Sequence, residues 1–255
     1  MTNDMKDLEE EAAWYHKSVG LLQKAKIPFL IGGAYALWKY TGVRRPTKDL
    51  DLFLRAQDMA PALKVMREGG FRTEITASHW IGKAFHKDFL MDFIVALANG
   101  VGQVDDTWFK KPVHAELCGK TLSLVRPEDM VWSKAFVMER DRYDGADIVH
   151  LLWAEGRHMD WKALLRRFVG HEAVLLSHLI LFGYIYPDMQ KIIPAWVIRH
   201  LGVHVKKKEG AKLPLKVCRG TLFSRIEYAA DVEGRGYHDA RLLPYGTLTA
   251  RQILE

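Results

Sequence analysis

Asp49-Leu50-Asp51-Leu52-Phe53-Leu54 is the stretch that decides how this sequence is interpreted, and Gly32-Gly33 stands fifteen residues before it. Apolar and acidic residues alternate at its start, which predicts a β-strand, and side chains two positions apart on a strand point to the same face. Asp49 and Asp51 therefore place two like charges side by side. Their repulsion is costly unless a metal ion, a basic partner or a raised pKa offsets it. An exposed strand edge with two solvated acids is the alternative.

The glycine pair lies between two segments of different periodicity. Residues 27–31 predict a short buried strand, and residues 34–40 predict a helix. Glycines at a strand-to-helix turn let backbone N–H groups approach a phosphate closely, at the positive end of the following helix. Gly32-Gly33 therefore indicates a phosphate-binding turn, although a plain tight turn has the same sequence.

A third acid, Asp92, interrupts an otherwise apolar run that predicts a strand over residues 89–96. A lone carboxylate in such a run is unfavourable unless it has a function or a partner. Residues 80–85 predict the preceding strand, and a hairpin through residues 86–88 would join the two. A salt bridge from a nearby lysine or arginine is the alternative to a catalytic role for Asp92.

The ordered set of Gly-Gly, Asp-x-Asp and a third aspartate on a later strand resembles the nucleotidyltransferase superfamily typified by DNA polymerase β. Residues 31–36 and 45–52 look like its bacterial minimal and toxin-type branches. Those branches include antibiotic nucleotidyltransferases and the toxins of abortive-infection systems. The resemblance covers residues 27–95 and extends more loosely to the helix that bears Lys134. Many members carry serine where this chain has Gly33, so one hydroxyl donor to a phosphate is missing.

The resemblance implies a metal-dependent transfer of a nucleoside monophosphate (NMP) group from a nucleoside triphosphate (NTP) to a hydroxyl acceptor. Asp49 and Asp51 would each bind two Mg²⁺ ions, or Mn²⁺ in their place, and Asp92 would complete the shell of one ion. Asp92 is also the best candidate to accept the proton of the acceptor hydroxyl. Three aspartates suit Mg²⁺, which prefers oxygen ligands.

Further residues are implied as nucleotide ligands. Gly32 and Gly33 would supply backbone donors, and Lys134 is similar to a family lysine that reaches the triphosphate. Arg45 and Thr47, which come just before the acidic strand, would approach the nucleotide. A surface position for Lys134 and a plain loop role for Arg45 and Thr47 are the alternatives.

Strands interleaved with helices predict an α/β (α+β) class with a mixed, nucleotidyltransferase-type sheet flanked by helices. We expect this domain over residues 1–125. Residues 126–255 predict a mainly helical domain with a basic C-terminal segment, because helical periodicity dominates beyond Pro127. The segment 220–255 has no interpretation from the sequence.

The net charge of +6 is concentrated in one segment. Residues 199–225 hold eight basic residues and a single acid, Glu209. Such a patch attracts phosphate-bearing partners, so RNA is favoured slightly as the acceptor over a small molecule or a protein. A solvated surface loop is the alternative.

The acidic N-terminus lacks the pattern of a signal peptide, and the longest apolar stretch, residues 173–186, is short for a membrane span. We therefore expect a cytoplasmic protein without membrane contact, and a toxin–antitoxin system is one setting that the resemblance suggests. Two other functions stay open: a catalytically inactive nucleotide- or RNA-binding regulatory module of the same fold, and a metal-dependent phosphohydrolase.

Overall fold

The computed structural model describes residues 3–45, 47, 49–87, 89–117, 119–208 and 216–254. The chain divides into two compact units. The first comprises Met1–Lys39, Val43–Arg126 and Thr249–Glu255, and the second comprises Tyr40–Gly42 and Pro127–Leu248. The C-terminal residues from Thr249 onward are thus grouped with the first unit rather than with the residues that precede them.

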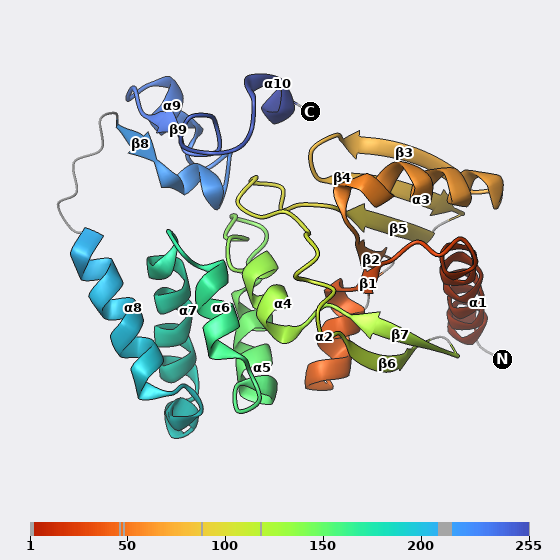
Figure 1. Cartoon of the computed structure of the whole chain (residues 1–255), viewed down its shortest axis with the longest axis horizontal. Helices are drawn as coiled ribbons and strands as arrows, with labels where there is room; N and C mark the ends of the chain where they lie inside the picture. Colours follow the sequence, from red (N-terminus) through yellow and green to blue (C-terminus); the bar gives the residue numbers. More distant parts are fainter. Residues whose placement is uncertain are drawn as a thin grey trace. The chain divides into compact units, whose positions relative to one another are not determined.

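The first unit is built on a seven-stranded sheet with the strand order β3-β4-β5-β2-β1-β7-β6 (Figure 1). β2 runs parallel to β5 and antiparallel to β1, and β7 runs parallel to β1. The sheet is therefore mixed, and the predicted fold class is confirmed. The elements of this unit are α1 (Asn3–Lys24), β1 (Leu30–Ile31), α2 (Gly33–Thr41), β2 (Asp49–Phe53), α3 (Ala56–Glu68), β3 (Arg72–Ala77), β4 (Ile81–His86), β5 (Phe89–Ile94), β6 (Val113–Leu117), β7 (Lys120–Leu124) and α10 (Ala250–Leu254).

One face of this sheet packs against α3. Gly82 on β4 approaches Met59 and Leu63 of that helix so closely that a Cβ there would lie 2.8 Å and 3.1 Å from their side chains. Ala84 and Met91, which share the face of Gly82, are fully buried. Because side chains alternate along a strand, Lys83 on β4 and the aspartates of β2 and β5 point to the opposite face.

Several elements differ from the sequence prediction. The hairpin β6-β7 was not predicted, although polar and apolar residues alternate along β6 and over residues 121–124 of β7. The sequence predicts a helix over residues 61–68, but α3 begins at Ala56, and Pro61 lies inside it, where a proline removes a single backbone hydrogen bond. The sequence also predicts a helix over residues 128–140, but α4 ends at Lys134, because residues 137–144 form a loop closed by a bridge between Met138 and Tyr143.

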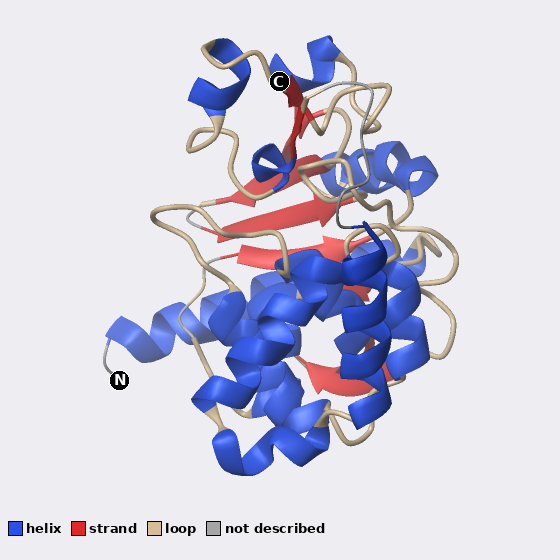
Figure 2. Cartoon of the chain, turned by 90° about the vertical axis from the view of Figure 1, so that its left-hand side faces the viewer, coloured by secondary structure: helices blue, strands red, loops and turns tan. Residues whose placement is uncertain are grey.

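The second unit is mainly helical, as predicted, and Figure 2 shows its helices in blue. α7 packs against α5 and α8, and α4 against α5 and α6. Trp132, Phe136 and Phe168 form an aromatic cluster in its core. The elements are α4 (Pro127–Lys134), α5 (Gly145–Glu155), α6 (Trp161–Arg167), α7 (Glu172–Ile185), η1 (Pro187–Ile192), α8 (Ala195–Lys208), β8 (Val217–Cys218), η2 (Arg219–Leu222), α9 (Ala229–Glu233) and β9 (His238–Asp239). None of the helices in the described ranges has the length and hydropathy to cross a membrane.

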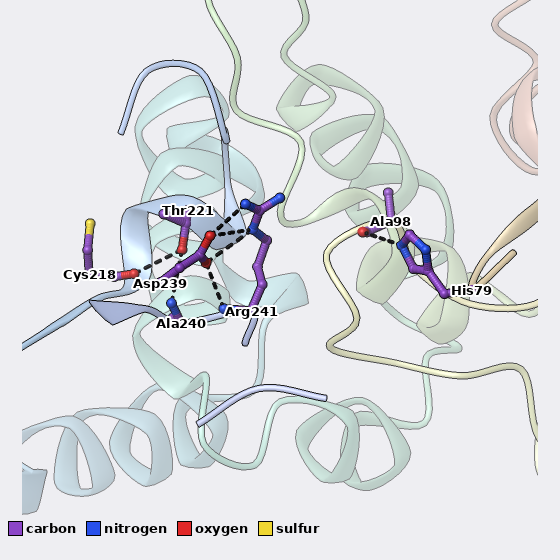
Figure 3. A network of polar contacts seen from close by, with 7 residues as sticks. All are labelled: His79, Ala98, Cys218, Thr221, Asp239, Ala240 and Arg241. Carbon is purple, nitrogen blue, oxygen red and sulfur yellow. Dashed lines mark hydrogen bonds and ion pairs between the residues drawn. The ribbon is translucent and has the colours of Figure 1, made fainter. Parts of the chain in front are cut away.

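The segment that the sequence left without an interpretation is held by a buried polar network (Figure 3). Arg241 donates hydrogen bonds to both carboxylate oxygens of Asp239, at 2.6 Å and 3.1 Å. The amide of Ala240 donates to the hydroxyl of Thr221, which in turn donates to the carbonyl of Cys218. Burial raises the pKa of Asp239, but the hydrogen bonds from Arg241 outweigh it and hold the pKa below its ordinary value. The network therefore ties the short parallel pair β8-β9 to η2.

Candidate active site

Asp51 lies in a row of residues that crosses three neighbouring strands. On β5, Asp92 is directly opposite Asp51 of β2, and on β4 Lys83 is directly opposite Asp92. On the other side of β2, the amide of Gly32 donates to the carbonyl of Asp51 at 2.9 Å. Asp49 shares the face of Asp51 because it lies two positions before it on the same strand. We refer to Asp49, Asp51 and Asp92 as the aspartate face.

The glycine pair is required by two close approaches. Gly33 begins α2 with a φ of +53°, and a Cβ there would lie 1.6 Å from Oδ2 of Asp51. At Gly32 a Cβ would lie 2.3 Å from the ring of Phe53. The carboxylate of Asp51 is thus packed against the backbone of Gly33, at the positive end of a helix. A side chain at position 33 would therefore displace the carboxylate of Asp51 from this position.

Asp92 has a lysine partner, which is the alternative that the sequence analysis gave to a catalytic role, without naming Lys83. Nζ of Lys83 donates to Oδ1 of Asp92 at 2.9 Å, and the two side chains are only 21% and 13% exposed. Burial raises the pKa of Asp92 above its ordinary value, Lys83 opposes this increase, and the negative charge of Asp49 adds to it. The predicted hairpin came within one residue of this pair: a turn through residues 86–88 pairs position 83 with 91, whereas the structure pairs His86 with Phe89 and so places Lys83 opposite Asp92.

The residues that precede β2 shape its start. The amide of Asp49 donates to the hydroxyl of Thr47 at 3.2 Å, and that hydroxyl also lies 3.3 Å from the carbonyl of Asp49. Arg45 is exposed. Pro46 and Lys48 lie outside the described residues. Thr47 therefore contacts the backbone of the acidic strand in this structure, and a nucleotide contact for Thr47 or Arg45 stays a prediction.

Lys134 lies in the second unit and is enclosed by acids. Its Nζ is 3.0 Å from Asp144 and 2.7 Å from Asp147, and its side chain is 13% exposed. Burial raises the pKa of Asp144, but Lys134 and Arg142 outweigh this effect and hold the pKa below its ordinary value. The alternative of a surface lysine is therefore wrong. A triphosphate contact for Lys134 stays a prediction.

Replacing Lys134 by methionine should lower the free energy of unfolding by about 3 kcal/mol at neutral pH, because two buried carboxylates lose their counter-charge. The lowered pKa of Asp144 also fixes the sign of the pH dependence. Its contribution to stability is fully present above the ordinary carboxyl pKa of about 4, and it is lost as the pH falls through the lowered pKa. The difference between wild type and Lys134→Met should therefore shrink towards about pH 3.

Urea unfolding at both pH values measures this difference. Lys162→Met, which removes an exposed lysine of α6, is the matched control and should change little at either pH. A destabilisation by Lys134→Met that is the same at both pH values would contradict the assignment of the effect to the two acids.

The aspartate face fits a divalent ion in donor type. Carboxylate oxygens are the ligands that Mg²⁺ and Mn²⁺ prefer, and the three carboxylates lie on one face of two adjacent strands. Within the described residues, no three His, Cys, Asp or Glu side chains are grouped closely enough to hold a metal ion. Asp92 is bound by Lys83 in this arrangement.

Comparisons with known proteins found similar structures only. No family model matches the chain, and no curated protein matches it. The antibiotic-resistance factor ANT(2'')-Ia is 18% identical with a TM-score of 0.46, over 67% of this chain and 97% of that one. The lincosamide antibiotic adenylyltransferase LnuA is 16% identical with a TM-score of 0.40, over 56% and 95%.

An antigenic nucleotidyltransferase-like protein from Paracoccidioides brasiliensis is 15% identical with a TM-score of 0.48, over 75% of this chain and 97% of that one. Nucleotidyltransferases are thus among the structures that this chain is similar to. The functional interpretation below depends on the residues of the chain itself, because identities and scores at this level carry no argument.

Proposed function

We propose that this protein transfers an NMP group from an NTP to a hydroxyl acceptor with the help of divalent metal ions. The aspartate face is the observation that carries the proposal. It brings together two carboxylates on β2, a third directly across on β5, and a glycine turn whose backbone contacts Asp51. This combination provides oxygen ligands for a metal ion next to a helix N-terminus that suits a phosphate.

The residues would divide the chemistry between them. Asp49 and Asp51, with Asp92, would hold Mg²⁺ or Mn²⁺, and bound ions neutralise charge on the triphosphate and on the attacking and leaving oxygens. Gly32 and Gly33 would orient the phosphates through their N–H groups. The acceptor oxygen attacks the α-phosphorus, the bond to the β-phosphate oxygen breaks, and pyrophosphate leaves.

Asp92 would take the proton of the acceptor hydroxyl on a carboxylate oxygen. Its raised pKa suits this role, because a base works best when its pKa lies near the working pH. Lys134, Arg45 and Thr47 remain our candidates for contacts to the triphosphate and the nucleotide.

RNA as the acceptor depends on the charge of the segment 199–225 alone. On α8, Arg199, Lys206 and Lys207 are exposed. The acid of this segment, Glu209, and its Lys212 lie in the range 209–215, outside the described residues. Small hydroxylated molecules and proteins are therefore equal alternatives in the test below. A cytoplasmic location and a toxin–antitoxin setting stay predictions.

One observation favours a second candidate, a nucleotide-binding module without catalysis. The ammonium group of Lys83 already neutralises Asp92, so the aspartate face is partly compensated without a metal ion. In a protein without catalytic activity and without a bound metal ion, the charge of Lys83 would stabilise the aspartate face.

The test is to incubate the purified protein with Mg²⁺ and each α-labelled NTP, in separate reactions with cellular RNA, hydroxylated small molecules and bulk protein. We expect label on one class of acceptor. Metal-dependent NTP binding without transfer would support the inactive module. Release of phosphate without transfer of the α-phosphate would indicate a phosphohydrolase, and neither binding nor turnover would contradict the proposal.

A further inference from the structure

Lys83 supplies a positive charge to the aspartate face from within the sheet. It lies on β4 directly opposite Asp92, and its Nζ is 2.9 Å from Oδ1 of that residue. The neighbours of Lys83 on the strand, Gly82 and Ala84, pack on the other face, with Gly82 against α3. The strand therefore fixes the direction of the lysine, and the ion pair is a product of sheet register rather than of a loop.

Lys83 also has a second acid across the sheet. On β3, Glu74 is directly opposite Lys83, so the lysine lies between two carboxylates on its two neighbouring strands. Glu74 accepts from Arg72 at 3.0 Å and from Thr76 at 3.3 Å. Its pair with Arg72 is exposed, and exposed pairs of this kind contribute little free energy. Glu74 therefore lies on the same face as Lys83, and its exposed pair with Arg72 costs little free energy to break.

A divalent ion at the aspartate face must compete with this lysine. The ion and the ammonium group would both use the carboxylate of Asp92, and both are cations, so their mutual repulsion opposes simultaneous binding. Without either cation, the like charges of Asp49, Asp51 and Asp92 would face one another on adjacent strands.

We propose that Lys83 is a displaceable counter-cation, which binds Asp92 while no divalent ion is present and moves to Glu74 when an ion takes Asp92. This inference rests on the proposed function, because it requires that the aspartate face binds a metal ion. As a consequence, the free-energy difference between Lys83 bound to Asp92 and Lys83 bound to Glu74 helps to set the metal concentration at which the site is filled.

The test is a titration of the full-length protein with Mn²⁺ alone, in which the free ion is followed by electron paramagnetic resonance. Lys83→Met keeps much of the aliphatic stem and removes the competitor, so its Kd for Mn²⁺ should fall by about tenfold. Glu74→Gln removes the alternative partner, so its Kd should rise by about threefold. A general loss of structure would weaken Mn²⁺ binding in both variants, so it would not shift their two Kd values in opposite directions.

Two controls accompany these variants. Lys83→Arg keeps the charge, and its Kd should stay close to that of the wild type. Lys64→Met removes an exposed lysine from α3, which covers the other face of the sheet, and it should leave the Kd unchanged. Thermal unfolding of each variant identifies any that fail to fold, and the exposed site of Glu74 keeps the test decisive if Lys83→Met does not fold.

Equal or weaker Mn²⁺ binding by folded Lys83→Met would overturn the proposal, and an unchanged Kd in Glu74→Gln would overturn the move to Glu74. The variant Asp51→Asn distinguishes an error in the role of Lys83 from an error in the proposed function. If Asp51→Asn loses Mn²⁺ while wild type and Lys83→Met bind equally, only the role of Lys83 is wrong. If Asp51→Asn binds as well as wild type, the metal site itself is wrong, and the inference fails with it.

Discussion

Asp51→Asn should abolish nucleotidyl transfer, with a decrease in kcat of about a thousandfold or more. Asp51 lies between Asp49 on its own strand and Asp92 on the next, and its carboxylate is packed against Gly33. Asparagine keeps the size of the side chain but removes the negative charge that a metal ion needs. Transfer of α-labelled phosphate to the acceptor, with saturating NTP and Mg²⁺, measures the effect.

The matched control is Asp106→Asn. Asp106 belongs to the same unit, its side chain is 77% exposed, and its pair with Arg55 lies at the surface. This variant should retain activity close to that of the wild type, because exposed ion pairs contribute little. A variant Asp51→Asn that folds and keeps more than about a tenth of the wild-type kcat would show that the metal is held elsewhere.

The sequence was sufficient to predict the parts of the first unit that depend on local pattern. Alternation predicted β2, an apolar run predicted β5, the glycine pair predicted the turn before α2, and the short turn through residues 86–88 predicted the hairpin between β4 and β5. These features carry the aspartate face. They were predictable because one face of each strand is apolar and buried, so the register is strongly determined.

Other features depend on which strands become neighbours, and this information is not local. β6 and β7 escaped prediction although their polar and apolar residues alternate, and β7 takes its place in the sheet through a parallel pairing of Leu124 with Ile31. The enclosure of Lys134 by Asp144 and Asp147 requires the loop that ends α4 early. Lys83 lies between these cases, since the hairpin was predicted but with a register one residue away from the one that places Lys83 opposite Asp92.

Gly33→Ser is the second variant for which we expect a large effect, and the resemblance and the structure predict opposite results. Many proteins of the resembled superfamily carry serine at this position, so the substitution would be expected to add a phosphate donor. In this chain a Cβ would overlap Oδ2 of Asp51 at 1.6 Å, and a φ of +53° disfavours any residue other than glycine. We therefore expect transfer activity to fall by about a hundredfold, because Asp51 is forced out of its position.

Gly70→Ser separates the effect of the Cβ overlap with Asp51 from the effect of backbone strain at a positive φ. Gly70 belongs to the same unit and has a φ of +89°, but a Cβ there meets no atom within 4 Å. It should therefore lower the thermal unfolding midpoint through backbone strain and leave transfer activity nearly intact. Activity of Gly33→Ser equal to that of Gly70→Ser would mean that Asp51 does not lie against Gly33 in the working enzyme. A loss confined to Gly33→Ser would instead establish that the glycine is needed for the placement of one carboxylate, and that this chain arranges the turn differently from the serine-bearing proteins of the resembled superfamily.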